Sequence, residues 1–68
     1  MQNELYRIPF KGEVFGGFKY MDACIILYSE FKIILFALEV NLEGERRVFV
    51  SPIDYVFSYD DHYAYVIN

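Results

Sequence analysis

The stretch DACIILYSEFKIILFALEV, residues 22–40, decides between two folds. As one helix over about residues 22–38 it offers Asp22 as an N-cap, but its apolar side chains fall on two opposite faces instead of one stripe. As two strands, its apolar runs 23–28 and 33–38 are the short, continuous kind that a sheet buries on both faces. We therefore predict two strands here and keep the single helix as the alternative.

On the N-terminal side, two shorter segments have the composition of strands. Residues 5–10 combine Tyr, Ile and Phe in a short run and predict a first strand. Residues 13–20 predict an irregular second strand. We expect it to bend at Gly16 and Gly17, because glycine inside a strand pattern marks a bend or bulge.

On the C-terminal side, residues 36–40 and 46–50 flank a polar loop that contains Gly44, which is typical of a hairpin. In the register that we expect, Glu39 lies opposite Arg47. Opposite charges that face each other across two strands contribute roughly 0.2–1 kcal/mol. The sequence therefore predicts a hairpin with this register.

Residues 53–59 show the clearest alternation of side chains in the chain and predict a further strand. An acidic turn follows, and residues 63–67 then return as an antiparallel partner. With a loop of three residues Tyr59 lies opposite Tyr63, and with a loop of two it lies opposite His62. We favour the longer loop, in which His62 takes a left-handed conformation.

These segments predict a single small all-β domain over residues 1–68. Its 68 residues and 8.1 kDa allow one domain at most. We expect five or six antiparallel strands in a compact barrel or strongly bent sheet. The alternative is an α+β domain with one helix at about residues 22–38.

The composition leaves more apolar surface than so short a chain can bury. The chain is 56% hydrophobic and 21% aromatic, with a mean hydropathy of +0.20. A domain of this size hides only about 60% of the surface of its unfolded chain. Apolar patches that stay exposed usually mark a contact with another molecule. We therefore expect a homo-oligomer or a docked protein partner.

Charge and cysteine content narrow the class of protein. Ten acidic and six basic residues give a net charge of −4, which is the wrong sign for a dedicated nucleic-acid binder. The single Cys24 cannot form an internal disulfide, and the N-terminal residues lack the features of a signal peptide, so we expect a cytoplasmic protein. The apolar stretch 21–40 carries four charged residues, which argues against a membrane span.

No residue pattern for catalysis, metal binding or cofactor binding stands out. His62 follows Asp60 and Asp61, but one His beside carboxylates is a weak metal or acid–base signal, and a charged turn explains the same residues. Cys24 lies among apolar neighbours, as a buried cysteine does. The glycines of residues 12–17 match neither a phosphate loop nor a dinucleotide fingerprint. We therefore expect a protein that is not an enzyme and holds no metal or cofactor.

The best candidate for a binding surface is an aromatic cluster near the C-terminus. Tyrosine is enriched at interfaces because its ring can be buried while its hydroxyl stays hydrated. In the favoured register one face carries the cluster beside the acidic turn. The residues concerned are Tyr55, Phe57, Tyr59, Tyr63 and Tyr65, with Asp60 and Asp61. The same face would serve equally as the core of the domain, and both interpretations stay open.

We therefore expect a non-enzymatic protein-interaction module, a small acidic oligomer that binds a protein partner. One form of this hypothesis is that the binding inhibits the partner. The alternative is an oligomeric small barrel that binds a nucleotide or single-stranded nucleic acid. In that case tyrosines stack on bases, and Arg46 or Arg47 contacts phosphate. The net charge argues against nucleic acid, because attraction to phosphate supplies most of such affinity.

Overall fold

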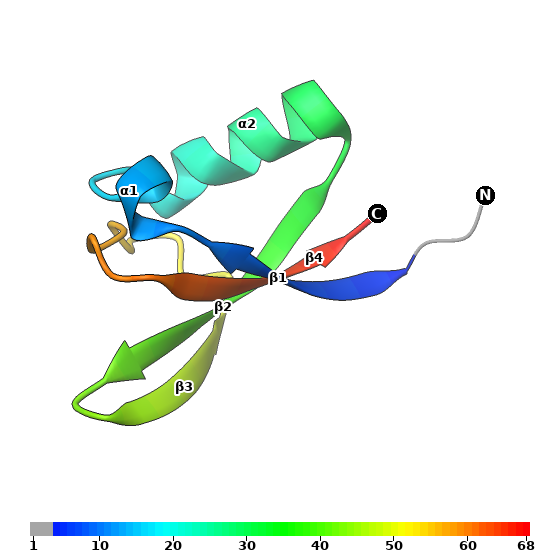
Figure 1. Ribbon diagram of the computed structural model, residues 1–68. Coiled ribbons are helices and arrows are strands. Elements are labelled where there is room, and N and C mark those ends of the chain that lie inside the picture. Colours follow the sequence, from blue (N-terminus) through cyan, green and yellow to red (C-terminus); the bar gives the residue numbers. More distant parts are fainter. Residues whose placement is uncertain (1–3) are drawn as a thin grey trace.

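The computed structural model describes residues 4–68 and shows a four-stranded antiparallel sheet with two helices (Figure 1). In chain order the elements are β1 (Leu5–Phe10), α1 (Gly12–Phe15), α2 (Tyr20–Phe31), β2 (Ile34–Leu42), β3 (Glu45–Val50) and β4 (His62–Ile67). The strands lie in the order β1-β4-β2-β3, and α2 lies along one face of the sheet (Figure 1). The predicted small, bent antiparallel sheet is confirmed, with four strands instead of five or six and with a helix, as in the α+β alternative.

The first predicted strand is confirmed with its bounds. β1 covers residues 5–10 and pairs antiparallel with β4, from Leu5 opposite Ile67 to Phe10 opposite His62. β4 pairs on its other side with β2, so both of its edges are occupied. The first and last described residues consequently lie close together, and Glu4 and Asn68 exchange two backbone hydrogen bonds of 2.9 and 3.0 Å.

The stretch over residues 22–40 is a helix in its first half and a strand in its second. The predicted strand 23–28 is wrong, because these residues belong to α2, where Met, Ala, Leu and Glu have good helix propensity. The helix stops at Phe31 and not at 38, because Lys32 takes a left-handed conformation with φ 58° and its N–H bonds back to the last turn. The predicted strand 33–38 is confirmed from residue 34 onward, as part of β2.

The predicted hairpin of residues 36–40 and 46–50 is confirmed, but its register is wrong by one residue. Its loop is only two residues long, Glu43 and Gly44, with φ 52° and 85°. Two central residues with positive φ form the type I′ turn that matches the twist of the flanking strands. Glu39 therefore lies opposite Val48 and not opposite Arg47.

The predicted strand over residues 13–20 is wrong. The short helix α1 takes up its first half, and a turn through Gly17, with φ 86°, leads into α2. The double glycine does interrupt the chain there, as expected. The two glycines separate α1 from α2 instead of bending a strand.

The predicted strand 53–59 and its hairpin with 63–67 are also wrong. Residues 51–61 run as an irregular segment alongside residues 17–20, to which they are tied by three backbone hydrogen bonds of 2.8 Å each. The physical reason is that β4 already has β1 and β2 as neighbours, so it has no free edge for a third strand. Tyr59 consequently faces neither His62 nor Tyr63 across a ladder.

The core lies between α2 and the sheet, and aromatic rings close its end nearest α1. The ring centroids of Phe10 and Phe15 are 4.3 Å apart in a stacked pair, and Phe57 packs against both at 5.9 Å. The fully buried side chains include Tyr20 and Leu38. The segment 51–61 therefore contributes to the core through Phe57, although it is not a strand.

Candidate interaction surface

Helix α2 is apolar around nearly its whole circumference. Two of its twelve residues, Asp22 and Glu30, are charged. Its buried residues Tyr20, Ala23 and Leu27 lie at i, i+3 and i+7 and face the sheet. A helix that is hydrophobic all round is normally buried on all sides, whereas α2 has the sheet on one side only (Figure 1). The side of α2 that faces away from the sheet is therefore apolar and uncovered.

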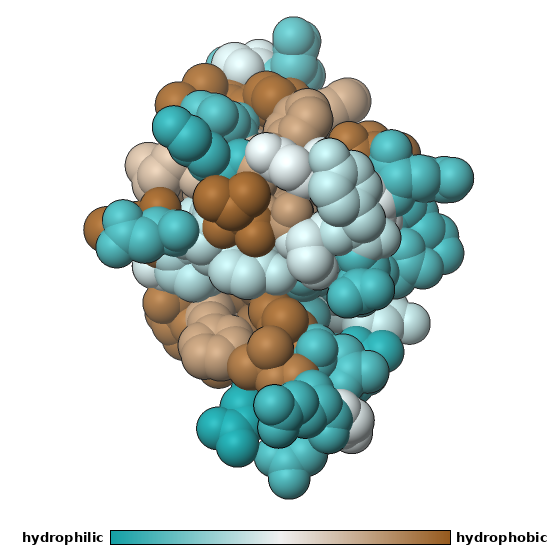
Figure 2. Space-filling model, turned by 90° about the vertical axis from the view of Figure 1, so that its left-hand side faces the viewer, coloured by the Kyte–Doolittle hydropathy of each residue, from teal (hydrophilic) through white to brown (hydrophobic). Residues whose placement is uncertain are grey.

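Five large apolar side chains form this surface, which we call the α2 outer face. They come from α2 and the turn before it, and their exposed fractions are 38% for Phe18, 45% for Met21, 61% for Ile25, 38% for Ile26 and 54% for Tyr28. Met21, Ile25 and Tyr28 follow one another at i, i+4 and i+7 and so form one continuous stripe. Hydrophobic atoms also reach the surface at several places in the view of Figure 2, where hydrophilic atoms separate them.

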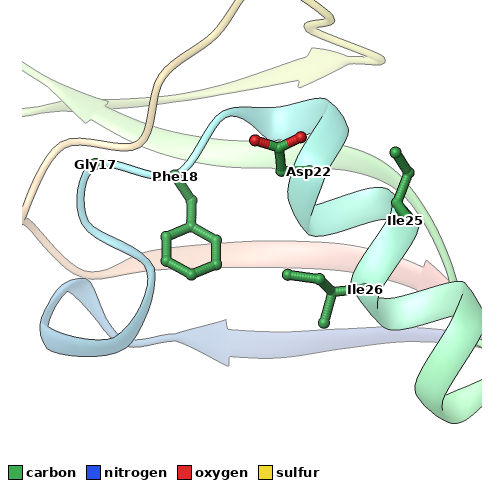
Figure 3. A pocket seen from close by; sticks show the side chains of 5 residues that line it. All are labelled: Gly17, Phe18, Asp22, Ile25 and Ile26. Atoms are coloured by element: carbon green, nitrogen blue, oxygen red, sulfur yellow. The ribbon is translucent and has the colours of Figure 1, made fainter.

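An open hollow of about 410 Å³ lies beside this stripe. Its lining residues are Gly17, Phe18, Asp22, Ile25 and Ile26. The side chains of Phe18 and Ile26 point toward the same space between the turn and the helix (Figure 3). Asp22 is the one charged residue in this lining. The hollow can therefore accept an apolar group with a positive charge beside it.

On the opposite face of the sheet, Glu39 of β2 lies at the centre of a polar cluster. Its carboxylate accepts hydrogen bonds from Arg7 Nη2 at 2.8 Å, from the Tyr65 hydroxyl at 2.8 Å and from Arg46 Nη1 at 3.3 Å. These partners come from β1, β4 and β3, so one carboxylate connects all four strands. The hydrogen bond from Arg7, and then that from Tyr65, lower the pKa of Glu39 to about 2.

Two guanidinium groups lie close to the ring of Tyr63 in the same cluster. Arg7 Cζ is 3.7 Å from the ring centroid, and Arg46 Cζ is 5.1 Å from it. Both distances are within the range of cation–π attraction. The ring is consequently engaged with the protein's own cations.

The five side chains of the predicted aromatic cluster do not share one face. Phe57 is buried in the core and Tyr55 is half-buried next to it, whereas Tyr59 is 77% exposed. Tyr63 and Tyr65 lie on the sheet face that points away from α2, because Ala64 between them is buried on the α2 side. The single face depended on the 53–59 hairpin, which does not form. A binding role for any of the five stays a prediction.

The other predicted site residues are also dispersed. Arg46 joins the Glu39 cluster, whereas Arg47 pairs with Glu45 at 3.1 Å and points to the other side of the sheet. Asp61 is occupied locally, because its Oδ1 accepts a hydrogen bond from the backbone N–H of Gly12 at 2.9 Å. The structure therefore brings Arg46, Tyr63 and Tyr65 together around Glu39, places Tyr55 next to Phe57 at the core, and disperses the other predicted residues.

His62 is buried and does not form part of an exposed charged turn, contrary to the prediction. It is 2% exposed, and its Nδ1 lies 2.8 Å from the Asp60 carbonyl oxygen, which can only accept. Nδ1 therefore carries a proton, and Nε2, 2.6 Å from the Tyr55 hydroxyl oxygen, accepts a hydrogen bond from Tyr55 in the neutral ring. These bonds assign His62 to the core as a partner of the 51–61 segment.

Cys24 packs against the core from α2, as the sequence predicts, but it is half-buried and not fully buried. Burial raises the pKa of its thiol, which disfavours the reactive thiolate. Within residues 4–68, no group of three or more His, Cys, Asp or Glu side chains is placed to hold a metal ion. No helix in the described part of the chain is long and apolar enough to cross a membrane.

No family model matches the chain, and no curated protein matches it. The α2 outer face was missed by the sequence reasoning, although one signal for it was present. The two apolar faces expected for residues 22–38 counted there as an argument against a helix, whereas residues 22–31 of that stretch do belong to a helix, with one apolar face left uncovered. Arg7 was missed as a partner of Glu39 because 32 residues separate them.

Proposed function

We propose that this chain is a non-enzymatic protein-interaction module that binds a partner protein through the α2 outer face and associates with copies of itself. One observation carries the proposal: a helix with only two charged residues among its twelve rests on a sheet and leaves Met21, Ile25 and Tyr28 exposed to water. In a protein that works as a monomer, polar side chains on the uncovered side of the helix would keep the fold equally stable. An apolar face at this position is therefore expected where another molecule binds.

The partner that fits this face is a protein segment with apolar anchor side chains and a basic residue. The apolar anchors fill the hollow beside Phe18 and Ile26, and Lys or Arg pairs with Asp22 at its rim. The net charge of −4 favours approach of a basic segment over an acidic one. Occupying the apolar site of such a partner would also inhibit it.

The size of the face sets the expected affinity. Covering its five side chains removes on the order of 400 Å² of apolar surface from water, which contributes roughly 10 kcal/mol. Association costs about 4–15 kcal/mol in lost freedom. The partner contributes apolar surface of its own, so a dissociation constant in the micromolar range is the expected scale.

A cytoplasmic location is part of the proposal and rests on Cys24, the one cysteine of the chain, which has no internal disulfide partner. The alternative, binding of single-stranded nucleic acid, receives less support. Arg46 is engaged by Glu39, and both arginines near Tyr63 cover a ring that base stacking would need free.

The proposal is tested with a displayed library of random peptides of about 16 residues, long enough to lie along α2. We expect the selected peptides to carry apolar residues with Lys or Arg, and to bind in the micromolar range by fluorescence anisotropy. Ile25→Lys should weaken this binding at least about tenfold, which corresponds to about 1.4 kcal/mol. Ile53→Lys is the matched control, because Ile53 is 60% exposed against 61% for Ile25. It should leave the affinity unchanged.

A charge exchange then tests the role of Asp22. The Asp22→Lys variant should bind a Lys-containing peptide more weakly than wild type does. Replacing that Lys of the peptide by Glu should restore the affinity for the variant. The proposal is contradicted if the selected peptides bind the Ile25→Lys variant as well as they bind the wild type. It is equally contradicted if no peptide of this composition binds.

A further inference from the structure

The sheet has two edge strands, and only one of them is protected. β1 carries Pro9, which has no N–H to offer to another strand. β3 contains no proline, all six of its residues are exposed, and its register with β2 is continuous from Glu45 to Val50. An exposed edge without a bulge is a template for pairing with another strand.

The backbone groups available on this edge follow from the hairpin. In the type I′ turn the Leu42 carbonyl accepts from the Glu45 N–H, and hydrogen-bonded pairs then recur at every second residue. The bond from Ser51 N–H to the Phe36 carbonyl, at 2.7 Å, has the same parity further along. The residues between the bonded ones therefore direct their N–H and C=O groups to the free edge. They are Arg46, Val48 and Val50.

We propose that β3 pairs antiparallel with β3 of a second copy, with Val48 on the twofold axis, so that two sheets join into one of eight strands. This rests on the self-association stated above and adds the surface and the register. Outward-directed groups must meet outward-directed groups. Val48 therefore pairs with Val48 of the second copy, and Arg46 pairs with Val50 of the second copy on each side of the axis.

Shifting the two strands by one step in either direction gives two competing registers, and both should be less stable than the register with Val48 on the axis. A shift toward the hairpin loop places Arg47 directly opposite Arg47 of the second copy, and like charges in that position repel. A shift the other way places Phe49 on the axis and leaves three residues of each strand in the ladder, because the chain leaves the extended conformation at Ser51, where φ is 46°. With Val48 on the axis, Arg47 lies opposite Phe49 of the second copy, a contact that suits a guanidinium and a ring.

The charges on β3 also permit this strand to pair with β3 of a second copy. Arg46 is 3.3 Å from Glu39, and Arg47 is 3.1 Å from Glu45, so each cation of the strand has a carboxylate within its own subunit. Neither arginine of β3 therefore brings an unpaired positive charge to the interface. Val48 and Val50, which are 53% and 73% exposed, lose water-exposed surface when the strands meet.

Sedimentation equilibrium over about 1 μM to about 1 mM tests this, a range that brackets the weak constants of small interfaces. We expect wild type to rise from 8.1 kDa to twice that mass. Val48→Lys should stay monomeric, because Lys on an edge strand opposes pairing. Val14→Lys is the matched control, since Val14 is 58% exposed but lies on α1. It should behave as wild type.

Cross-linking reads the register directly, with Cys24 replaced by Ala. Val48→Cys should form an intermolecular disulfide, because paired residues on the axis have Cα atoms about 5.5 Å apart, inside the range for a disulfide. Arg47→Cys should not cross-link. If the Arg47→Cys variant cross-links faster than the Val48→Cys variant, the proposed register is wrong.

Each sedimentation outcome separates this proposal from the proposed function. A wild type that stays at 8.1 kDa throughout overturns the self-association and the β3 pairing together, and leaves peptide binding at α2 to be judged by its own test. A dimer that survives Val48→Lys but is lost in Ile25→Lys overturns the β3 pairing alone. In that case the α2 outer face is covered by a second copy.

Discussion

Glu39 is the central residue on the face of the sheet that points away from α2. Its side chain is only 10% exposed, yet it is charged, and it is stabilised by Arg7, Arg46 and Tyr65 from the three other strands. A carboxylate buried this far requires such partners, because desolvation alone would disfavour its ionised form. The cluster therefore connects the four strands and stabilises the ionised form of Glu39.

The lowered pKa of Glu39 makes stability depend on pH in a defined direction. Its pKa is about 2 in the folded protein against an ordinary value of 4.5. Because the folded value is the lower one, the stabilisation is fully present above about pH 5 and is lost as the pH falls toward 2. We expect the free energy of unfolding in urea to fall over this interval, and to fall less steeply in Glu39→Gln.

Glu30→Gln, at an exposed position on α2, is the control for that measurement and should keep the pH slope of wild type. Equal slopes for wild type and Glu39→Gln would show that the cluster does not stabilise the fold through this charge.

The Glu39 cluster also shows how far single residues can be predicted. The sequence indicated that Glu39 would face an arginine of the next strand, and Arg46 does contact it. Arg7 could not be predicted, because β1 reaches the cluster only across β4, an order of strands that no local pattern specifies. The predicted partner Arg47 was wrong because a two-residue loop shifted every pair by one residue and turned that side chain to the other face.

At the level of elements, local chemistry predicted four segments correctly, among them 63–67 as part of β4, and it misled on three, which are 13–20, 23–28 and 53–59. Residues 5–10, 33–38 and the 36–50 hairpin are strands because their composition and Gly44 agree with the final fold. Residues 53–59 alternate like a strand, but β4 had no free edge to receive them. They serve instead as a strap that covers α1 and inserts Phe57 into the core. Alternation reports which side chains face inward, and it cannot report whether a partner strand is available.

The close contact between this strap and α1 gives a prediction. A Cβ at Gly12 would overlap the carbonyl oxygen of Tyr59, which is backbone and cannot rotate away. Gly12→Ala should therefore lower the free energy of unfolding by about 3 kcal/mol, the upper range for overpacking. Gly44→Ala is the comparison. It has open space but φ of 85°, and a left-handed alanine costs about 1–2 kcal/mol.

Chemical denaturation of the two variants at neutral pH measures these changes in the free energy of unfolding. An alanine at residue 12 that costs less than one at residue 44 would mean that the strap does not lie against α1 as described.

For the whole molecule, the composition alone predicted exposed apolar surface, and the structure shows where it lies. Seventeen large hydrophobic residues are exposed among those described, and they include the α2 outer face and the three C-terminal residues of β3. The amount of such surface follows from the ratio of apolar residues to chain length. Its position does not, because it depends on which side of α2 the sheet covers and which strand ends at an edge.

Methyl NMR of the full chain, recorded over a dilution series and then with a selected basic, apolar peptide, tests most directly whether these two surfaces bind separately. We expect dilution to shift the methyl signals of Val48 and Val50 but not those of Ile25 and Ile26. We expect the peptide to shift Ile25 and Ile26 and to leave Val48 unchanged. If all four signals stay fixed under both conditions, the exposed apolar surface binds neither a copy nor a partner segment, and the proposed interaction module is wrong.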